Sequence, residues 1–240
     1  MLEILSKNNQ KVKDACALKM KKVRQEKGLF LMEGIKNLDM ALKFGNVKQI
    51  FTAIGLPKLK QDIECYKVND EVLRKLANSE NPEGVVFVCE QLKPQKDKSE
   101  YRKIVYLDQI NDPGNLGTIL RTAVAFDYDA VILSKSSVDI YNEKVVAASK
   151  GALFLVDAFY DEIDAYTNGR VVIASALEDA VSLSKSEKPK DFVLVLGNES
   201  HGVSKEILSN ANKVVKIEMN DNIDSLNVAV AAGILMNYYK

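Results

Sequence analysis

The feature that most constrains the fold is a series of short, almost uninterrupted runs of Val, Ile and Leu after residue 102. The runs are "KIVYLD", "DAVILS", "LFLVD", "RVVIASA", "FVLVLG" and "NKVVKIEM". Helix-like segments lie between them. Strands that are apolar on both faces and alternate with helices are typical of a mostly parallel sheet covered on both sides. The sequence therefore predicts an α/β domain over residues 103–240.

The first hundred residues also alternate helix and strand patterns, and a polar stretch separates them from the rest. This stretch, "QLKPQKDKSEYRK", is charged and contains Pro94, so it is the best linker candidate in the chain. Before it, helical spacing occurs at 12–26, 33–45 and 69–78, and strand patterns occur at 47–53 and 83–90. We predict two domains: a smaller α/β domain at 1–98 with a linker at about 91–102, and a larger one at 103–240.

Three loops after the predicted strands are rich in Gly, Asn, Asp and Ser. They read "NDPGNLG", "GNESHGVS" and "MNDNIDSLN", and they follow the strands "KIVYLD", "FVLVLG" and "NKVVKIEM". In open parallel sheets, ligands bind beyond the carboxyl ends of the strands. The sequence therefore predicts a site at this edge.

The first loop contains neither the G-x-G-x-x-G pattern of dinucleotide sites nor a P-loop. Arg121 lies six residues after Asn115 in an otherwise apolar or small segment, and the two are expected to face roughly one side of a helix. A guanidinium there could bind phosphate or carboxylate as a fork. The structural alternative is an arginine that pairs with a helix end or with Asp108.

The other two loops also allow structural interpretations. Glu199 could cap a helix, and His201 is assigned no role. Asp224 and Ser225 are suitable caps for the helix that follows, whose apolar residues are expected to be buried in the core or in a subunit interface. Asn227, in its first turn, is expected to be buried, either within a structural hydrogen-bond network or in contact with substrate.

Charge and composition restrict the function classes. Residues 1–100 carry 19 Lys and Arg against 14 Asp and Glu, which suits a polyanionic partner or, more simply, a solvated helix face. The three cysteines are far apart and His201 is the single histidine, so disulfides and a metal site are not expected. The N-terminus lacks the apolar core of a signal peptide, and no apolar run is long enough to span a bilayer. A cytoplasmic protein without a membrane partner is expected.

The three loops, in this order, resemble the motifs of the SpoU/TrmH family of the SPOUT superfamily of RNA methyltransferases. The matching segments are "NDPGNLGTILRTA", "LVLGNESHGVS" and "VVKIEMNDNIDSLNVAVAAGILM". The resemblance implies a SPOUT α/β domain with a deep trefoil knot, S-adenosylmethionine as methyl donor and an RNA ribose 2′-hydroxyl as acceptor. It also implies a homodimer that completes the active site. The N-terminal part is similar to the family's ribosomal-protein-like substrate-binding domain.

The resemblance also assigns site residues. Asn115 and Arg121 match the functional pair of the first motif, Glu199 the acidic residue of the second, and Ser225 and Asn227 the third. The donor contacts that it implies are Gly197, Ile217, Leu226, Asn198, Met219 and Ala176, with no metal. Because arginine stays protonated in proteins, Arg121 is interpreted as an organiser of the phosphate and the reacting hydroxyl rather than as a base.

The resemblance favours ribosomal RNA as the substrate, and two alternatives remain. One is a transfer-RNA 2′-O-methyltransferase, and the other is a catalytically inactive RNA-binding or ribosome-assembly protein. A nicotinamide-dependent dehydrogenase is disfavoured, because its glycine fingerprint is missing.

Overall fold

The computed structural model describes residues 2–56, 59, 63–177, 179–220 and 222–240. Asp221 in the third predicted loop, and residues 1, 57–58 and 60–62 of the predicted N-terminal domain, lie outside the described residues. The chain forms two compact units, Met1–Leu92 with Tyr141–Phe154, and Lys93–Ile140 with Leu155–Lys240. Tyr141–Phe154 thus belongs to the first unit, although it lies within the predicted 103–240 domain by sequence.

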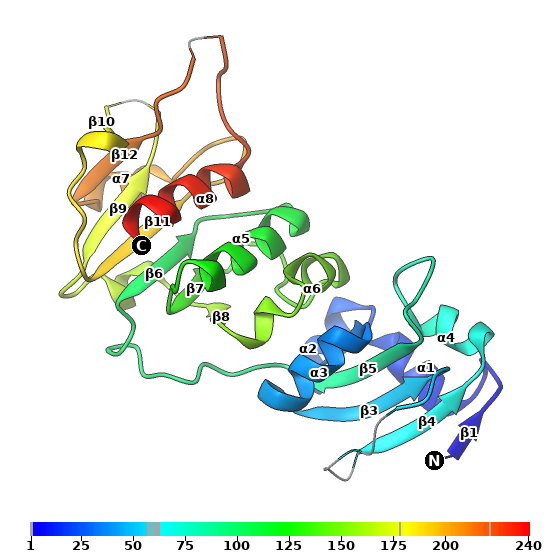
Figure 1. Cartoon of the computed structure of the whole chain (residues 1–240). Helices are drawn as coiled ribbons and strands as arrows, with labels where there is room; N and C mark the ends of the chain where they lie inside the picture. Colours follow the sequence, from blue (N-terminus) through cyan, green and yellow to red (C-terminus); the bar gives the residue numbers. More distant parts are fainter. Residues whose placement is uncertain (1, 57–58, 60–62, 178, 221) are drawn as a thin grey trace. The chain divides into compact units, whose positions relative to one another are not determined.

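The first unit is built on a five-stranded mixed sheet in the order β1-β4-β3-β5-β2 (Figure 1). Its strands are β1 (Leu2–Ile4), β2 (Leu29–Glu33), β3 (Val47–Thr52), β4 (Glu64–Val68) and β5 (Val85–Glu90). Its helices are α1 (Gln10–Ala17), α2 (Lys21–Lys27), α3 (Ile35–Phe44), α4 (Asp70–Leu76) and α6 (Glu143–Ser149), with a short 3₁₀ turn, η1 (Ala152–Phe154).

The single helix predicted at 12–26 is two helices. The buried side chain of Arg24 donates hydrogen bonds to the carbonyls of Leu18 and Lys19, at 2.9 and 2.8 Å, and so satisfies the carbonyls at the turn between α1 and α2. The spacing of apolar residues runs through this turn, which is why periodicity alone does not reveal the break.

The second unit contains a seven-stranded sheet in the order β10-β12-β9-β11-β6-β7-β8, and its neighbouring strands pair in parallel. Its strands are β6 (Lys103–Leu107), β7 (Ala130–Leu133), β8 (Asp157–Tyr160), β9 (Val171–Ser175), β10 (Val181–Ser182), β11 (Phe192–Leu196) and β12 (Lys213–Lys216). The predicted parallel α/β sheet is confirmed. The central strands β6, β7 and β11 are buried almost throughout, as their apolar runs require.

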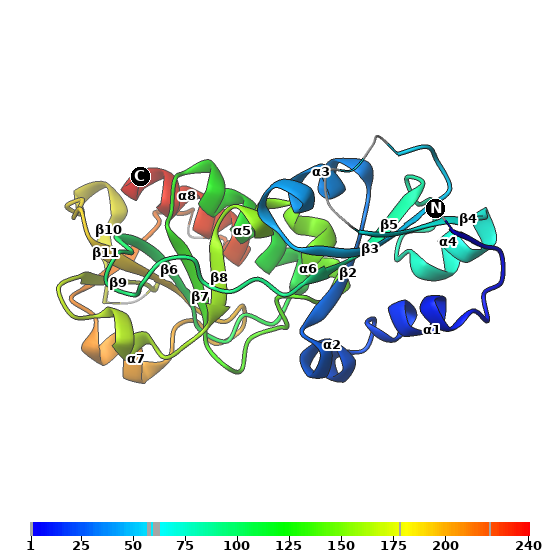
Figure 2. The same ribbon diagram turned by 90° about the horizontal axis from the view of Figure 1, so that it is seen from below.

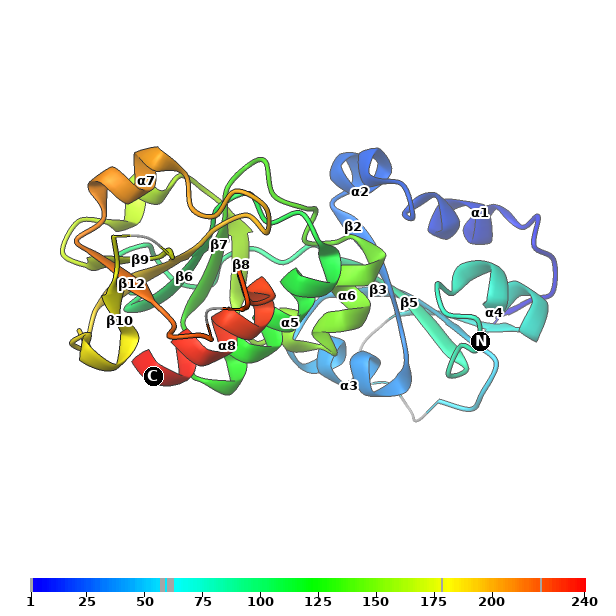
Figure 3. The ribbon, with the colours of Figure 1, turned by 90° about the horizontal axis from the view of Figure 1, so that it is seen from above.

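Helices cover this sheet on both faces. They are α5 (Pro113–Ala125), α7 (Lys205–Asn210) and α8 (Val228–Tyr239), and 3₁₀ turns occur at η2 (Ile163–Tyr166) and η3 (Leu183–Lys185). Figures 2 and 3 show α5 and α8 side by side on one face of the sheet and α7 on the other. The carboxyl ends of β6 and β11 therefore open between α5 and α8 on one face and α7 on the other.

The strand predicted at "LFLVD" is wrong in position. Leu153 and Phe154 are buried in the turn η1, and the strand β8 begins only at Asp157. The apolar run reflects burial of this turn within the first unit, where the ring of Phe154 lies 6.3 Å from that of Phe30. The strand β8 lies at the edge of its sheet and is half exposed. Its sequence therefore lacks the unbroken apolar run by which the central strands were predicted.

The predicted linker is held along the second unit by hydrogen bonds. The carboxylate of Asp157 accepts the backbone N–H of Gln95, at 3.0 Å, and the hydroxyl of Tyr101, at 2.7 Å. The guanidinium of Arg170 donates to the carbonyls of Lys98 and Tyr101. Burial, followed by the hydrogen bond to Asp157, raises the pKa of Tyr101, so this hydroxyl remains a donor at neutral pH.

Candidate active site

The first two predicted loops meet where β6 and β11 end. The backbone N–H of Asp108, just after β6, donates to the carbonyl of Leu196 at the end of β11, at 2.8 Å. Just beyond this pair, the Asn198 side-chain amide donates to the carbonyl of Gln109, at 2.8 Å. The parallel pairing of these strands thus continues into the loops and fixes them against each other.

A chain of side-chain hydrogen bonds joins all three loops. The amide of Asn115 donates to Glu199 Oε1 at 3.0 Å, and its own oxygen accepts from the amide of Asn227 at 2.9 Å. Glu199 also receives longer contacts, of 3.5 and 3.4 Å, from the backbone N–H groups of Asn111 and Asp112. Residues more than eighty positions apart are therefore held in one polar cluster.

The helix starts explain why these side chains are available. Asp112 caps α5 by accepting the backbone N–H of Asn115, at 2.8 Å, and Pro113 occupies the first turn, where no donor is needed. Since Asp112 is the cap, the side chain of Asn115 is free to reach Glu199. Asn227 caps α8 through its oxygen and still has its amide group for Asn115.

The expectations for the start of α8 need correction. The cap is Asn227 itself, rather than Asp224 or Ser225, and the Asn227 side chain is exposed rather than buried. The helix is buried along one side, but it exposes Val230 and Ile234 at 51% and 39% of their surface. Its apolar sequence is therefore only partly explained by the core of one chain.

Gly197 allows the closest backbone approach in this region. A Cβ atom built on Gly197 would lie 2.0 Å from the carbonyl carbon of Gly202 and 2.1 Å from the nitrogen of Val203. The loop closes through paired hydrogen bonds between the backbones of Asn198 and Gly202, each 2.9 Å long. Only glycine leaves room for this closure.

A pocket with a volume of about 530 Å³ lies beside this loop. The apolar residues Leu177, Leu196 and Val228 line it, together with residues 197–203 of the loop that begins at Gly197. Ligand pockets of this size are typically apolar with a few placed polar groups. The pocket therefore suits a small molecule with a partly apolar body and a few polar groups.

The structure places the predicted donor-binding residues together. The lining of the pocket includes all six of them, Gly197, Ile217, Leu226, Asn198, Met219 and Ala176. It also includes Glu199 and Ser225. Asn115 and Asn227 are not in the lining and connect to it through Glu199.

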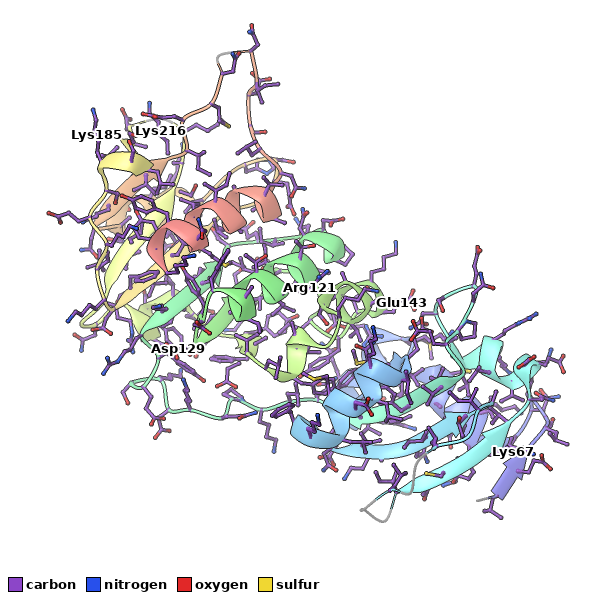
Figure 4. The ribbon with its side chains drawn as sticks, in the orientation of Figure 1. Lys67, Arg121, Asp129, Glu143, Lys185 and Lys216 are labelled. Atoms are coloured by element: carbon purple, nitrogen blue, oxygen red, sulfur yellow. The ribbon has the colours of Figure 1, made fainter. Side chains whose placement is uncertain are left out.

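Arg121 lies apart from this cluster. It is exposed on α5 (Figure 4), does not line the pocket, and has no hydrogen-bond or ion-pair partner in the described part of the chain. A separation of six residues leaves two side chains about 120° apart around a helix, so Asn115 and Arg121 point in different directions. Neither structural alternative for Arg121 is seen, since no described helix end or Asp108 oxygen lies within bonding distance of it; Asp108 accepts the backbone N–H of Ser204.

Sequence reasoning missed how the second loop is organised. The side-chain oxygen of Asn198 accepts the backbone N–H groups of Ser200 and His201, at 2.8 and 3.2 Å, and lies 3.2 Å from Nδ1 of His201. An asparagine directly after glycine is a common turn signal, which could have identified this residue as the organiser of the loop. Asp224 and His201 also line the pocket.

No group of three or more His, Cys, Asp or Glu side chains able to hold a metal ion occurs among the residues that the structure describes. No described helix has the length and apolar character needed to cross a membrane.

Comparison with known families assigns both parts of the chain. Residues 102–237 match the model of the SpoU rRNA methylase family, and residues 9–87 match the MRM3-like substrate-binding domain. The first match includes the whole of the candidate site. The second falls entirely within the first compact unit.

Individual relatives agree with these matches. The chain is 32% identical, over the full length of both proteins, to the 23S rRNA (guanosine(2553)-2′-O)-methyltransferase RlmP of Bacillus subtilis. An AdoMet-bound rRNA methyltransferase from Sinorhizobium meliloti superposes with a TM-score of 0.87 at 30% identity, covering 99% of this chain and 96% of that one. AviRb of Streptomyces viridochromogenes, solved with AdoMet, has a TM-score of 0.85 at 24% identity over 97% of each chain, which supports the fold alone. The chain belongs to the SpoU rRNA methylase family.

Proposed function

We propose that this protein transfers a methyl group from S-adenosylmethionine to a ribose 2′-hydroxyl of RNA, with ribosomal RNA as the substrate. The observation that carries the proposal is the hydrogen-bonded chain Glu199–Asn115–Asn227 beside the pocket at the carboxyl edge of the sheet. Its three residues come from the three motifs that carry the family resemblance. The full-length relative that methylates a ribose in 23S rRNA supports the choice of substrate.

The pocket fits the donor. Its apolar walls suit an adenine ring and a methionine carbon chain, and Gly197 and Ile217 lie where their backbone groups could offer hydrogen bonds. Leu226, Met219 and Ala176 would complete the walls. When bound, S-adenosylmethionine supplies an electrophilic methyl group on its sulfonium.

The protein's part in the reaction is to align the acceptor. Displacement at a methyl group depends on in-line geometry more than on covalent catalysis, so groups that hold the ribose and its hydroxyl contribute most. Glu199, fixed by Asn115, would position polar atoms of the acceptor, and the exposed Ser225 would shape the mouth of the pocket. A guanidinium fork, supplied by Arg121, would bind the adjacent phosphate and hold the hydroxyl.

We further propose that the enzyme is a cytoplasmic homodimer with a knotted C-terminal region, in which the Arg121 of one subunit serves the pocket of the other. Two observations support the dimer. Arg121 is exposed, has no partner among the described residues and lies outside the pocket of its own chain. The adjoining helix α8 exposes Val230 and Ile234, a small apolar face that a second copy would cover.

A titration with S-adenosylmethionine tests the donor site. Calorimetry on the full chain is expected to show saturable binding of S-adenosylmethionine and no binding of NAD, because the dinucleotide fingerprint is missing. Binding of NAD in place of S-adenosylmethionine would contradict the proposal. Donor binding without methyl transfer to any RNA would favour the alternative of an inactive RNA-binding protein.

An Asn227→Ala variant is expected to lose stability and, separately, activity. Removing the cap of α8 costs about 1 kcal/mol of folding free energy, and Asn115 loses the partner that orients it. Chemical denaturation and the rate of methyl transfer at saturating donor would measure the two effects.

Asn69→Ala is the matched control, because Asn69 caps α4 in the first unit in the same way. The two variants are expected to lose similar stability, but only Asn227→Ala should slow methyl transfer. Equal rates in both variants would show that Asn227 acts only as a helix cap.

A further inference from the structure

A second pocket of about 420 Å³ lies in the same unit, at the carboxyl ends of β6 and β7 on the side of α7. The loop and helix after β11 separate it from the donor pocket. Val203 and Leu208 line the donor pocket, whereas their neighbours Ser204 and Ile207 line the second one. The hydrogen bond from Asn198 to Gln109 joins the two linings, since Asn198 belongs to the first and Gln109 to the second.

The second pocket is strongly polar and acidic. Asp108, Glu162, Asp164 and Glu206 line it. Lys135, the one cation among its described lining residues, is paired with Glu162 at 2.8 Å. Burial raises the pKa of nearby Tyr106 to about 12, and the charges of Asp108, Glu162, Asp161 and Asp164 act in the same direction. A phosphate group would be repelled here, so an RNA backbone does not fit this pocket.

One oxygen of the buried Asp108 carboxylate has no partner among the described residues. Asp108 is 4% exposed, and its Oδ2 accepts the Ser204 N–H at 2.8 Å, but Oδ1 makes no hydrogen bond with the described residues. Every fully buried side-chain nitrogen or oxygen in the described part of the chain has a partner. Oδ1 of Asp108 must therefore be accessible, and the pocket that Asp108 lines provides the access. A fixed acceptor of this kind can receive a hydrogen bond from a ligand that enters the pocket.

We propose that this pocket takes a guanine base of the RNA substrate, turned out of its strand next to the reacting ribose. The inference rests on the proposed RNA methyltransferase function. Guanine presents two adjacent donors, N1–H and the 2-amino group, to carboxylate acceptors. The hydroxyl of Ser136 and the ammonium of Lys135, which also line the pocket, can donate to its carbonyl oxygen. Bases that enzymes take out of a strand are recognised through this edge.

The test is a binding comparison with short oligouridylates that carry one central guanosine, inosine or adenosine. Inosine lacks the 2-amino group of guanosine and is otherwise the same base. By fluorescence anisotropy, the full-length protein is expected to bind the guanosine oligomer about tenfold more tightly than the inosine oligomer. Equal affinity for the two oligomers would overturn the proposal.

An Asp108→Asn variant tests whether the preference for guanosine over inosine arises in this pocket. The side-chain oxygen of the new asparagine can still accept the Ser204 N–H. The amide NH₂ group then takes the place of Oδ1 and donates where Oδ1 accepted, so the preference for guanosine should disappear. Asp191→Asn, which removes the same charge from a partly exposed carboxylate outside the pocket, should keep the preference. If Asp108→Asn does not fold, the double variant Asp164→Asn with Glu206→Gln replaces it.

Two other results would contradict the proposal that this pocket binds guanine. A guanosine preference that survives both pocket variants would place recognition elsewhere. Binding of spermidine that Asp108→Asn weakens, without discrimination between the oligomers, would show a cation site instead. Donor binding and methyl transfer, measured on the same samples, report on the proposed function, so its failure is separable from failure of this inference.

Discussion

An Arg121→Ala variant is expected to lose at least about a hundredfold in the rate of methyl transfer while keeping its affinity for S-adenosylmethionine. Removal of one group that stabilises charge in a transition state typically costs 10²–10³ in rate. The donor affinity should not change, because Arg121 does not line the donor pocket. Single-turnover rates and calorimetric titration of the same preparation would measure the two quantities. An Arg121→Lys variant, which keeps the charge and loses the fork, is expected to recover only a small part of the rate.

Subunit mixing tests whether Arg121 acts across a dimer. Co-expression of the Arg121→Ala chain with a Glu199→Ala chain, each inactive alone, should form mixed dimers with one complete site. The expected activity is about a quarter of the wild-type rate, because half of randomly paired dimers are mixed and each has one working site of two. If the arginine acts within its own chain, the mixture will be as inactive as its parts.

A Gly197→Ala variant is expected to lose donor binding by about a hundredfold or more. The added Cβ atom would lie 2.0 Å from the carbonyl carbon of Gly202, so the loop that lines the pocket must move away from the end of β11. Overpacking of this kind also costs about 1–3 kcal/mol of stability. Calorimetry with S-adenosylmethionine and thermal unfolding would measure both effects.

Gly55→Ala provides the matched control, because a Cβ at Gly55 would meet no atom within 4 Å. This variant should bind the donor as tightly as the wild type. Wild-type donor affinity in the Gly197→Ala protein would mean that the closed loop does not shape the donor site.

The sheet of the second unit was predictable because its central strands are buried on both faces, which leaves an unbroken apolar run in the sequence. The strand β2 was missed although its central residues are apolar and buried. The other strands that prediction missed lack this signal. They include β1 and β10, which are short edge strands, and β4, which carries polar residues such as Glu64 and Lys67. The turn at Ala152–Phe154 has the apolar residues of a strand but is buried as a 3₁₀ turn, which periodicity cannot distinguish over so few residues.

The division of the chain into two compact units could not be predicted from the sequence either. Helix α6 lies between two strands of the second unit along the chain, yet it belongs to the first unit. Deleting residues 1–98 would therefore remove the packing partners of buried residues such as Val145 and Phe154. Substitutions in the full chain are the safer test of RNA binding by the first unit.

The loops of the candidate site could be located from the sequence, but the contacts between them could not. The motifs indicated Asn115, Glu199 and Asn227, whereas the hydrogen bonds that join them depend on strand order and on which residues cap α5 and α8. The separation of Arg121 from the pocket depends on the direction of α5. The second pocket had no sequence signal, because its acidic side chains come from three separate segments of the chain.

The most direct test of the proposed function is a mass-spectrometric map of 2′-O-methylation in ribosomal RNA from cells with and without this protein. We expect one ribose to lose its methyl group when the protein is absent. Wild-type protein should restore the methyl group, and the Arg121→Ala variant should not. An unchanged map of ribose methylation in ribosomal RNA, or a lost methyl group that proves to lie on a base, would contradict the proposed reaction.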